Sequence, residues 1–585
     1  RRAAGGRADL MSRARKLGLY LEIFSTMMRN IRVGLKRGLR RPASLSSRRV
    51  SGIIDITGLY PQALTPGDTV RGENWLAGDY TLPGALVKVA NTSPFDVPVA
   101  NSKWLASLHG FDWLRHICAL SAQRGATAAA FYVQDWIRRN PVRVKEAMRS
   151  DVIARRLMNW SAAMPIILPA LERREIDTIR QAMSQQSKYL ARCVDEENDG
   201  VRRLTAAFGL AYAGLAFSGD GQWVRQGVEV ILRELRRQIL ADGGHVSRSP
   251  LILADILNLI LALEAAMQAR TMQVPVTLVE TRKRMQAMLA LICHSDGGLG
   301  LFNGATARAA TEIAPLLAGL DAKNVMSYAQ RSGYQRLACG KLCLLVDAGQ
   351  ASGGAGTEIS HAAPLSLEMS YAQDRILVNC GPNLVHGEKW HLASRGVAAH
   401  SAFGFDADMS DPFLRSGLAA RVLGHRLKPE NWHVTCRRVE DTTGVWLETS
   451  HDQFAASHGV RYNRRLFVDT TGEDLRGEDM LMPASSKSKY IAARFHLRFH
   501  LHPQVSATLQ AGGSSVLLVS HSGHGWQFRF APQADQILKI EESVFMGDDG
   551  IPQRCQQIAI AGTLQPKDTQ MKWAMRYVGR IGRRR

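Results

Sequence analysis

At 585 residues the chain is too long for one ordinary domain, so we expect two or three. Hydrophobic residues make up 45% and charged residues 22%, which is typical of a globular protein and excludes a largely disordered one. No run of 18 apolar residues predicts a spanning helix, and the eight cysteines form neither zinc-type pairs nor a dense disulfide framework.

The net charge of +22 is concentrated at the start of the chain. Residues 1–50 hold 14 Lys or Arg and two acids, which gives a basic leader of about +12. Such a leader can contact nucleic acid, anionic lipid or an acidic glycan, or it can remain a solvated tail. Nucleic acid ranks last, because no helix-turn-helix, RNP or zinc-finger pattern accompanies the charge.

Part of this leader has helical periodicity. Leu17, Leu21, Phe24 and Met28 recur at helical spacing among Lys and Arg residues. The pattern predicts a partly amphipathic helix that lies on a membrane surface or packs on the body of the protein. The leader contains no clear signal peptide, since a proper apolar stretch and a small-residue cleavage site are missing.

Residues 51–100 are rich in Gly, Pro, Thr and Asn and predict an irregular connector. From about Trp104 the apolar residues follow helical period instead. Helical runs then cover roughly residues 126–140, 143–163, 167–194, 201–217, 220–241, 249–271 and 275–293. Short polar linkers between such helices predict an α/α toroid of helical hairpins over residues 101–330. No repeat of fixed period is visible, which favours an incomplete toroid over a repeat array.

After about residue 330 the pattern becomes that of strands. Short buried-type runs occur at residues 342–346, 375–378 and 515–519, and alternating runs occur at 445–448 and 494–500. Gly, Asp and Asn punctuate them at close spacing. These features predict a C-terminal domain of stacked antiparallel β-sheets, a β-sandwich, over residues 331–585.

Several stretches carry a family resemblance. They are DGGHVSRSP at 242–250, DGGLGLFNG at 296–304, SGYQRL at 332–337, HAAPLSLE at 361–368 and AAHS at 398–401. In this order and spacing, over about residues 100–580, the chain resembles the heparinase II/III-like family. The resemblance implies an α/α toroid followed by stacked sheets, and lyase action on uronic-acid polysaccharides by β-elimination. It also implies an acidic polysaccharide as partner and a place in the periplasm or cell envelope.

The chemistry of β-elimination sets three demands on a site. A group must neutralise the uronate carboxylate, a base must remove the C5 proton, and an acid must protonate the departing oxygen. By the resemblance, the Asn-His pair of the lyases falls here on Val201 and Arg202, and their catalytic Tyr falls on Ile252. Arg202 can neutralise a carboxylate, but Val201 and Ile252 have no proton to exchange.

Two functions therefore stay open. The first is a lyase with a rearranged site, in which His245 and Tyr334 are catalytic while Arg202 and Arg248 bind substrate. His245 follows two glycines at the mouth of a helix, and Tyr334 lies near the expected domain junction, where clefts are common. The second is a catalytically degenerate relative that binds glycan or associates with the cell envelope, in which these side chains are structural.

Some members of the family also hold a zinc ion with two His and one Asp in the β domain. The matching positions in this chain are His361, Asn379 and His400. Asparagine in place of the carboxylate disfavours zinc. The alternative is that both histidines are packed structural residues.

Overall fold

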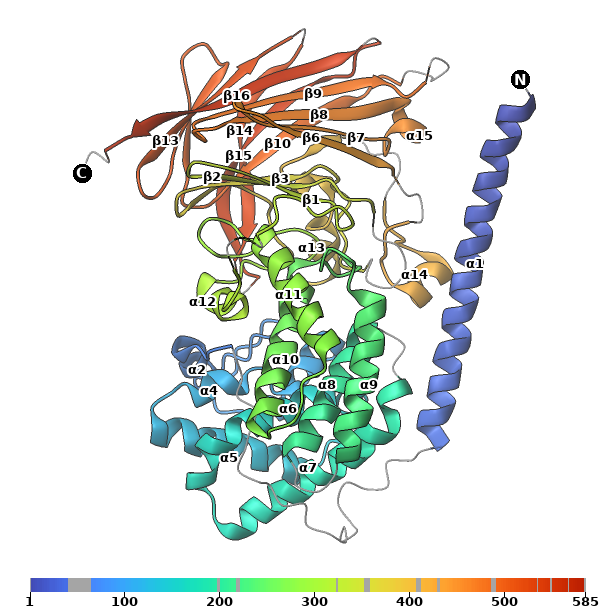
Figure 1. The fold of residues 1–585 in the computed structure, drawn as a ribbon, viewed down its shortest axis with the longest axis vertical. Helices are drawn as coiled ribbons and strands as arrows, with labels where there is room; N and C mark the ends of the chain where they lie inside the picture. Colours follow the sequence, from blue (N-terminus) through green and yellow to red (C-terminus); the bar gives the residue numbers. More distant parts are fainter. Residues whose placement is uncertain are drawn as a thin grey trace.

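The computed structural model describes residues 2–39 and 65–582, apart from 197–199, 217–220, 322, 324, 352–357, 407–411, 429–431, 486–490, 534, 548–549 and 567. A helical part and a β part lie one above the other, and one long helix runs beside both (Figure 1). The end of the expected leader and the first part of the expected connector, residues 40–64, lie outside the described residues.

The helical part confirms the fold class expected from the periodicity. Its main helices are α3 Ser102–Gly110, α4 Leu114–Cys118, α5 Ala122–Arg139, α6 Ser150–Ile167, α7 Arg173–Cys193, α8 Gly200–Ala216, α9 Gly221–Gln238, α10 Pro250–Ala269 and α11 Val276–Leu291. An added Cβ at Gly209 would lie 2.3 Å from the Cβ of Ala154, so this glycine allows α8 to approach α6 closely.

Helix α10 forms the centre of this part. Ser249 caps its N-terminus and Pro250 occupies its first turn, where the missing N–H costs nothing. Within the described part of the chain, α10 is the one helix that is long and apolar enough to cross a membrane. Leu257, Ile260 and Leu263 on it are fully buried inside the protein, as expected of a core helix.

The expected connector contains more structure than its composition indicates. Helix α2, Thr69–Leu76, begins at Asp68, whose side chain accepts hydrogen bonds from the backbone N–H groups of Val70 and Arg71. The indole of Trp75 then stacks on Trp113, with ring centroids 4.1 Å apart. Burial of this one aromatic ring fixes a polar, Gly-rich segment against the helical part.

The β part is a sandwich of two antiparallel sheets, as the sequence predicts. One has the order β1-β2-β3-β4-β10-β15-β14, with β5 beside β10, and the other has the order β11-β12-β13-β16-β9-β8-β7-β6. The strands are β1 Tyr334–Cys339, β2 Leu342–Asp347, β3 Leu367–Tyr371, β4 Asp374–Val378, β5 Phe403–Phe405, β6 Val434–Glu440, β7 Gly444–His451, β8 Val460–Asp469, β9 Asp474–Pro483, β10 Arg494–Leu501, β11 Ser506–Leu509, β12 Ser515–Val519, β13 His524–Ala531, β14 Ile537–Met546, β15 Pro552–Thr563 and β16 Thr569–Arg580.

Four further short helices lie in the connections between these elements: α12 Ala310–Ile313, α13 Glu388–Ala393, α14 Gly417–Leu423 and α15 Ala455–His458. The two parts are tied together by an ion pair and by a hydrogen bond between loops of the helical part and the first strands. Arg375 on β4 bonds Asp296 at 2.7 Å, and His294 bonds Glu368 on β3 at 2.8 Å. These contacts join segments that are more than 70 positions apart in the chain, and so they help to position the two parts.

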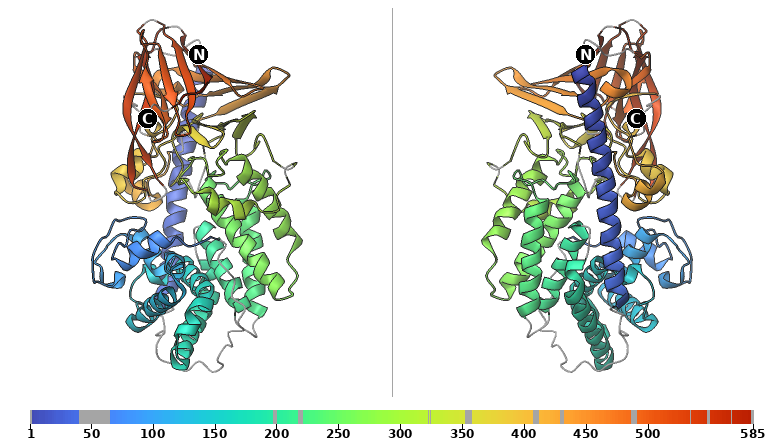
Figure 2. Two further views of the ribbon diagram at one scale, coloured as in Figure 1. Left: turned by 90° about the vertical axis from the view of Figure 1, so that its left-hand side faces the viewer. Right: turned by 90° about the vertical axis from the view of Figure 1, so that its right-hand side faces the viewer.

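The long helix α1, Arg2–Leu39, runs along one side of the molecule (Figure 2). It contacts α14, where Glu22 pairs with Arg426 at 2.9 Å and Ile23 is buried. Its opposite side carries an apolar stripe at helical spacing, and every member of that stripe is at least half exposed: Leu17, Leu21, Phe24, Met28, Ile31 and Leu35. The helix thus packs on the body of the protein with one face and exposes its apolar stripe on the other.

Candidate functional site

The candidate site is a cleft of about 990 Å³ between the two parts. Its floor and sides come from α2, α4, α6, α8 and α10, and its far wall comes from loops of the β part at Leu384, Val385, Ile551 and Gln553. The backbone N–H of Gly84 donates to the carbonyl of Leu384 at 2.7 Å, which closes one end. A cleft at such a junction is a common place for ligand binding.

The two positions that the resemblance assigns to lost catalytic groups lie in this cleft. Val201 on α8 and Ile252 on α10 both line it. Both side chains are aliphatic, and the assignment of the lyases' catalytic positions to them stays a prediction. Arg202, the next residue on α8, is exposed and does not belong to the cleft lining.

One histidine and one tyrosine in the cleft lining can in principle move a proton, as can its Asp side chains, of which Asp112 has a pKa that burial raises. The Nδ1 of His116 accepts a hydrogen bond from the backbone N–H of Asp68 at 2.9 Å, and burial lowers the pKa of His116 to about 4. Burial raises the pKa of Tyr212, whose side chain is 4% exposed. Neither the histidine nor the tyrosine is poised near neutral pH, which is what a general base requires.

The cations that line the described part of the cleft all have carboxylate partners. The pairs are Arg71–Asp68 at 3.8 Å, Lys88–Asp79 at 3.3 Å, Arg115–Glu312 at 4.0 Å, Arg308–Asp255 at 2.8 Å and Arg155–Asp112. Sequence reasoning missed these residues, because most of the paired residues are far apart in the chain, by as many as 197 positions for Arg115 and Glu312, and no local motif marks them. Only the packing of helices and loops around the cleft brings them together.

His245 lies outside the cleft, in the loop between α9 and α10. It is 3% exposed, its Nδ1 lies 2.7 Å from Ser247 Oγ, and its Nε2 lies 3.1 Å from Gln238 Oε1. Burial lowers the pKa of His245 to about 4. Both ring nitrogens are thus engaged in holding the loop.

Arg248 and Tyr334 meet at the junction, also outside the cleft lining. The Tyr334 hydroxyl donates to the carbonyl of Arg248 at 2.6 Å and accepts from Asn303 Nδ2 at 2.8 Å. The Arg248 guanidinium pairs with Asp347 and donates to the carbonyl of Ser332 at 2.8 Å. Burial raises the pKa of Tyr334, so it stays a neutral phenol that bridges the two parts.

His361 and His400 do come together, as the resemblance implies. His400 Nδ1–H donates to the carbonyl of Gly396 at 2.7 Å, so its Nε2 is the unprotonated nitrogen, and this Nε2 lies 2.6 Å from His361 Nδ1, which the backbone N–H of Asn303 also approaches at 3.2 Å. His361 Nε2 then accepts from the backbone N–H of Gly304 at 2.9 Å. Burial, and then the proximity of His400, lower the pKa of His361, so this pair is neutral.

This arrangement does not fit a zinc ion. Zn–N bonds of about 2.0 Å place two ligand nitrogens about 3.3 Å apart, whereas the facing nitrogens of His361 and His400 are in direct hydrogen-bond contact. The Oδ1 of Asn379 accepts from the backbone N–H of Ser401 at 3.0 Å instead of facing a metal. In the described ranges, no cluster of three or more His, Cys, Asp or Glu residues could hold a metal ion. Zinc binding itself stays a prediction.

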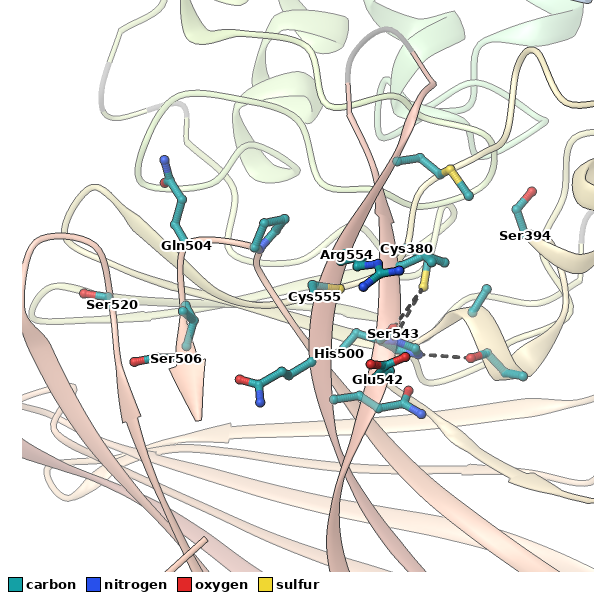
Figure 3. Close-up of a pocket in the computed structure, with 18 of the residues that line it drawn as sticks. Cys380, Ser394, His500, Gln504, Ser506, Ser520, Glu542, Ser543, Arg554 and Cys555 are labelled. Atoms are coloured by element: carbon teal, nitrogen blue, oxygen red, sulfur yellow. Dashed lines mark hydrogen bonds between the residues drawn. The ribbon is translucent and has the colours of Figure 1, made fainter. Parts of the chain in front are cut away.

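A second cavity of about 1070 Å³ lies in the β part, beside β14 and β15 (Figure 3). In it Ser543 Oγ donates to His500 Nδ1 at 2.7 Å, and His500 Nε2 donates to the carbonyl of Ala398 at 3.0 Å. Burial lowers the pKa of His500 to about 3 and raises the pKa of the nearby Cys380 thiol to about 12. Such values make a weak base and an inert thiol, so we assign no chemistry to this cluster.

Comparison with known proteins agrees with this architecture. The family model described as heparinase II/III N-terminus matches residues 97–317, and the one described as heparinase II/III-like, C-terminal, matches residues 322–574. The chain belongs to the heparinase II/III-like family.

Two solved structures illustrate the shared fold. A heparinase III structure superposes with a TM-score of 0.69 at 12% identity, covering 96% of this chain and 92% of the other. The heparan sulfate lyase HepC from Pedobacter heparinus gives a TM-score of 0.55 at 14% identity, covering 94% and 88%. At such identities the likeness establishes the fold alone.

One curated relative is more similar in sequence. It is the FtsZ-localized protein C of Caulobacter vibrioides, which is 28% identical over 554 residues, covering 92% of each chain. Its name describes a location with FtsZ.

Proposed function

We propose that this protein binds a glycan in the cleft between its two parts and does not cleave it by β-elimination. The observation that carries the proposal is the presence of Val201 and Ile252 in the cleft lining. The resemblance assigns Val201 to one member of the lyases' Asn-His pair and Ile252 to their catalytic Tyr. β-Elimination needs a base within hydrogen-bond reach of the C5 proton, and an aliphatic side chain cannot serve.

The positions of the replacement bases expected from sequence support this proposal. His245 and Tyr334 are buried, lie outside the cleft lining, and use their polar atoms to hold loops. Arg202 does not line the cleft either. A retained cleft with an altered reactive centre favours binding over catalysis. The alternative, a lyase with a relocated base, is decided by the experiment below.

The size and lining of the cleft suit a sugar chain. Its volume of about 990 Å³ lies at the upper end of the range for ligand sites, and it is open enough to hold several sugar units. The side chains of Asn74 and Ser107 lie in its lining and can form hydrogen bonds with sugar hydroxyl groups. We further propose, from the name of the Caulobacter relative, that the protein shares a location at the division site with FtsZ.

The test uses the whole protein against a panel of uronic-acid polysaccharides, with and without zinc and with and without EDTA. We expect no rise in the absorbance of 4,5-unsaturated uronate, while an active heparinase III gives one. We expect glycan binding that Thr205→Trp abolishes, because Thr205 lines the cleft, and that Thr178→Trp on exposed α7 leaves unchanged. A product signal that Tyr334→Phe or His245→Ala removes would establish the lyase instead.

A second proposed function concerns α1, which we propose to lie on a membrane surface. Its exposed apolar stripe includes Leu21, Phe24 and Met28, which are 60%, 64% and 51% exposed, and Arg29 and Arg32 are exposed next to it. An apolar face beside basic residues inserts at the headgroup boundary of anionic membranes. Its other face stays on α14, so the body can remain attached while the stripe is buried in lipid.

Vesicle sedimentation tests this contact. The whole protein should sediment with vesicles that contain anionic lipid, and binding should fall at least about tenfold with Leu21→Asp combined with Phe24→Asp. Ser25→Asp combined with Asn30→Asp adds the same charge off the stripe and should reduce binding far less. Equal loss in both double variants would show that only net charge matters, and it would contradict insertion of the stripe.

A further inference from the structure

The charge of the cleft bears on which glycan it binds. Each of its five described cations has a carboxylate partner within 4.0 Å, and four of the five partners also line the cleft. A cation already paired presents a much weaker field to a ligand than an unpaired one. The cleft therefore has alternating charges with almost no net charge, although the whole chain carries +22.

A uronic-acid polymer fits such a surface poorly. It brings one carboxylate for each uronate, and each would approach Asp side chains as closely as Arg or Lys side chains. Asp255 is half exposed and Asp112 is 38% exposed, so both present negative charge to the cleft. Juxtaposed like charges of this kind oppose binding and exclude the wrong ligand.

A neutral hydrogen-bonding ligand fits better. The Oδ1 of Asn258, on α10 in the cleft lining, is buried and has no hydrogen-bond partner, while its Nδ2 donates to Thr65 Oγ1 at 3.2 Å. A buried acceptor without a donor is unusual in proteins and costs stability until a partner arrives. Sugar hydroxyl groups and acetamido N–H groups are donors of the right kind.

We infer that the cleft takes a glycan segment without net charge, whose hydroxyl or acetamido groups donate to Asn258, and not a uronate polymer. This inference rests on the proposed glycan binding and names its ligand class. Paired charges along the cleft then orient the dipoles of a neutral chain, and the excess positive charge of the protein lies elsewhere, largely in residues 1–50.

The experiment compares two probes of equal length on the whole protein: N-acetylated chito-oligosaccharides, which are neutral, and alginate oligosaccharides, which carry one carboxylate per sugar. Only binding that Thr205→Trp abolishes is counted, since this excludes contact with the basic leader. We expect cleft binding of the neutral probe, at least tenfold tighter than alginate and nearly independent of salt. Asn258→Leu should weaken neutral binding about tenfold.

A charge variant gives the reciprocal result. Asp79→Asn combined with Asp255→Asn leaves Lys88 and Arg308 without these partners, so alginate affinity should rise about tenfold and become salt-dependent. The control Asp177→Asn on α7 removes an exposed partner of Arg180 outside the cleft. It should change neither the affinity for alginate nor the dependence of that affinity on salt.

The outcomes separate the two proposals. Alginate bound in the cleft of the wild-type protein as tightly as the neutral probe overturns the inference but keeps the proposed glycan binding. Neutral binding that Asn258→Leu leaves unchanged also overturns it. If neither probe binds, the inference is overturned. If none of the uronate polysaccharides binds either, the proposed glycan binding is overturned as well.

Discussion

His361 Nδ1 and His400 Nε2 lie 2.6 Å apart, and every remaining nitrogen of the two rings is already committed. His400 Nδ1–H donates to Gly396, and His361 Nε2 accepts from the N–H of Gly304. A proton added at either acceptor nitrogen would point at another donor. The pair is therefore stable only while both rings are neutral.

The first prediction is a loss of stability in mild acid. Burial lowers the pKa of His245 and of His400 to about 4, whereas the unfolded chain titrates its histidines near 6.5. Between these values the unfolded state binds more protons, so the free energy of unfolding falls as pH drops from about 6.5 to 4. At pH 4 each such group lowers the free energy of unfolding by on the order of 3 kcal/mol relative to neutral pH.

Urea unfolding followed by circular dichroism checks this prediction at pH 7.5, 6 and 5. We expect the midpoint to fall steadily over this range. Replacement of the pair by His361→Gln and His400→Gln should lower stability at pH 7.5 and reduce the dependence on pH. A midpoint that is level down to pH 5 would contradict the assignment of these rings as neutral and buried.

The second prediction concerns the ion pair inside the β-sandwich. Arg464 and Asp479 are both completely buried, 2.7 Å apart, and Asp479 also accepts from Trp573 Nε1 at 2.7 Å. Arg464→Met leaves a buried carboxylate without its cation and should cost about 3–5 kcal/mol. The adjacent Arg465 is half exposed and pairs with Glu448 at 3.3 Å, so Arg465→Met should cost less than about 1 kcal/mol. Chemical denaturation of the two variants measures these costs. A similar loss in the free energy of unfolding for both variants would contradict the prediction.

The third prediction separates structure from function at the junction. Tyr334→Phe removes hydrogen bonds to the Arg248 carbonyl and from Asn303, both in a buried site, and should lower the free energy of unfolding by about 1–3 kcal/mol. Glycan binding at saturating concentration of folded protein should not change, because Tyr334 does not line the cleft. If the variant lost glycan binding and kept its stability, Tyr334 would be a binding residue, which would contradict the prediction.

The sequence predicts the architecture well, because helical periodicity and short alternating runs are local signals. The strand expected at 515–519 is β12, Ser515–Val519, and the helix expected at 249–271 is α10, Pro250–Ala269. It does less well for residues 65–100, where composition indicates an irregular segment. There a single buried aromatic contact, Trp75 on Trp113, fixes a helix and one wall of the cleft.

The candidate site could be predicted only in part. Val201 and Ile252, the positions that the resemblance assigns to lost catalytic groups, both line the cleft, and their equivalence to those groups stays a prediction. The replacement catalytic residues inferred from sequence are His245 and Tyr334. They were inferred because His245 follows two glycines and Tyr334 lies near the expected domain junction. Such cues do not say which way a side chain points, and both rings turn into the protein to hold loops. The charge pairs of the cleft depend on long-range packing, which periodicity does not report.

The fourth prediction is that restoring the lost groups does not by itself restore a lyase. Ile252→Tyr with Val201→Asn and Arg202→His supplies a base and a pair, but a uronate carboxylate must also be neutralised before its C5 proton becomes acidic. Arg308 in the cleft stays paired with Asp255 at 2.8 Å. We expect no unsaturated product from the triple variant, and a slow but measurable rise in absorbance when Asp255→Asn is added. The matched control adds Asp177→Asn to the same triple variant and should stay inactive. Activity in the triple variant alone would show that the paired cations already suffice, and the charge of the cleft would then not be what prevents elimination.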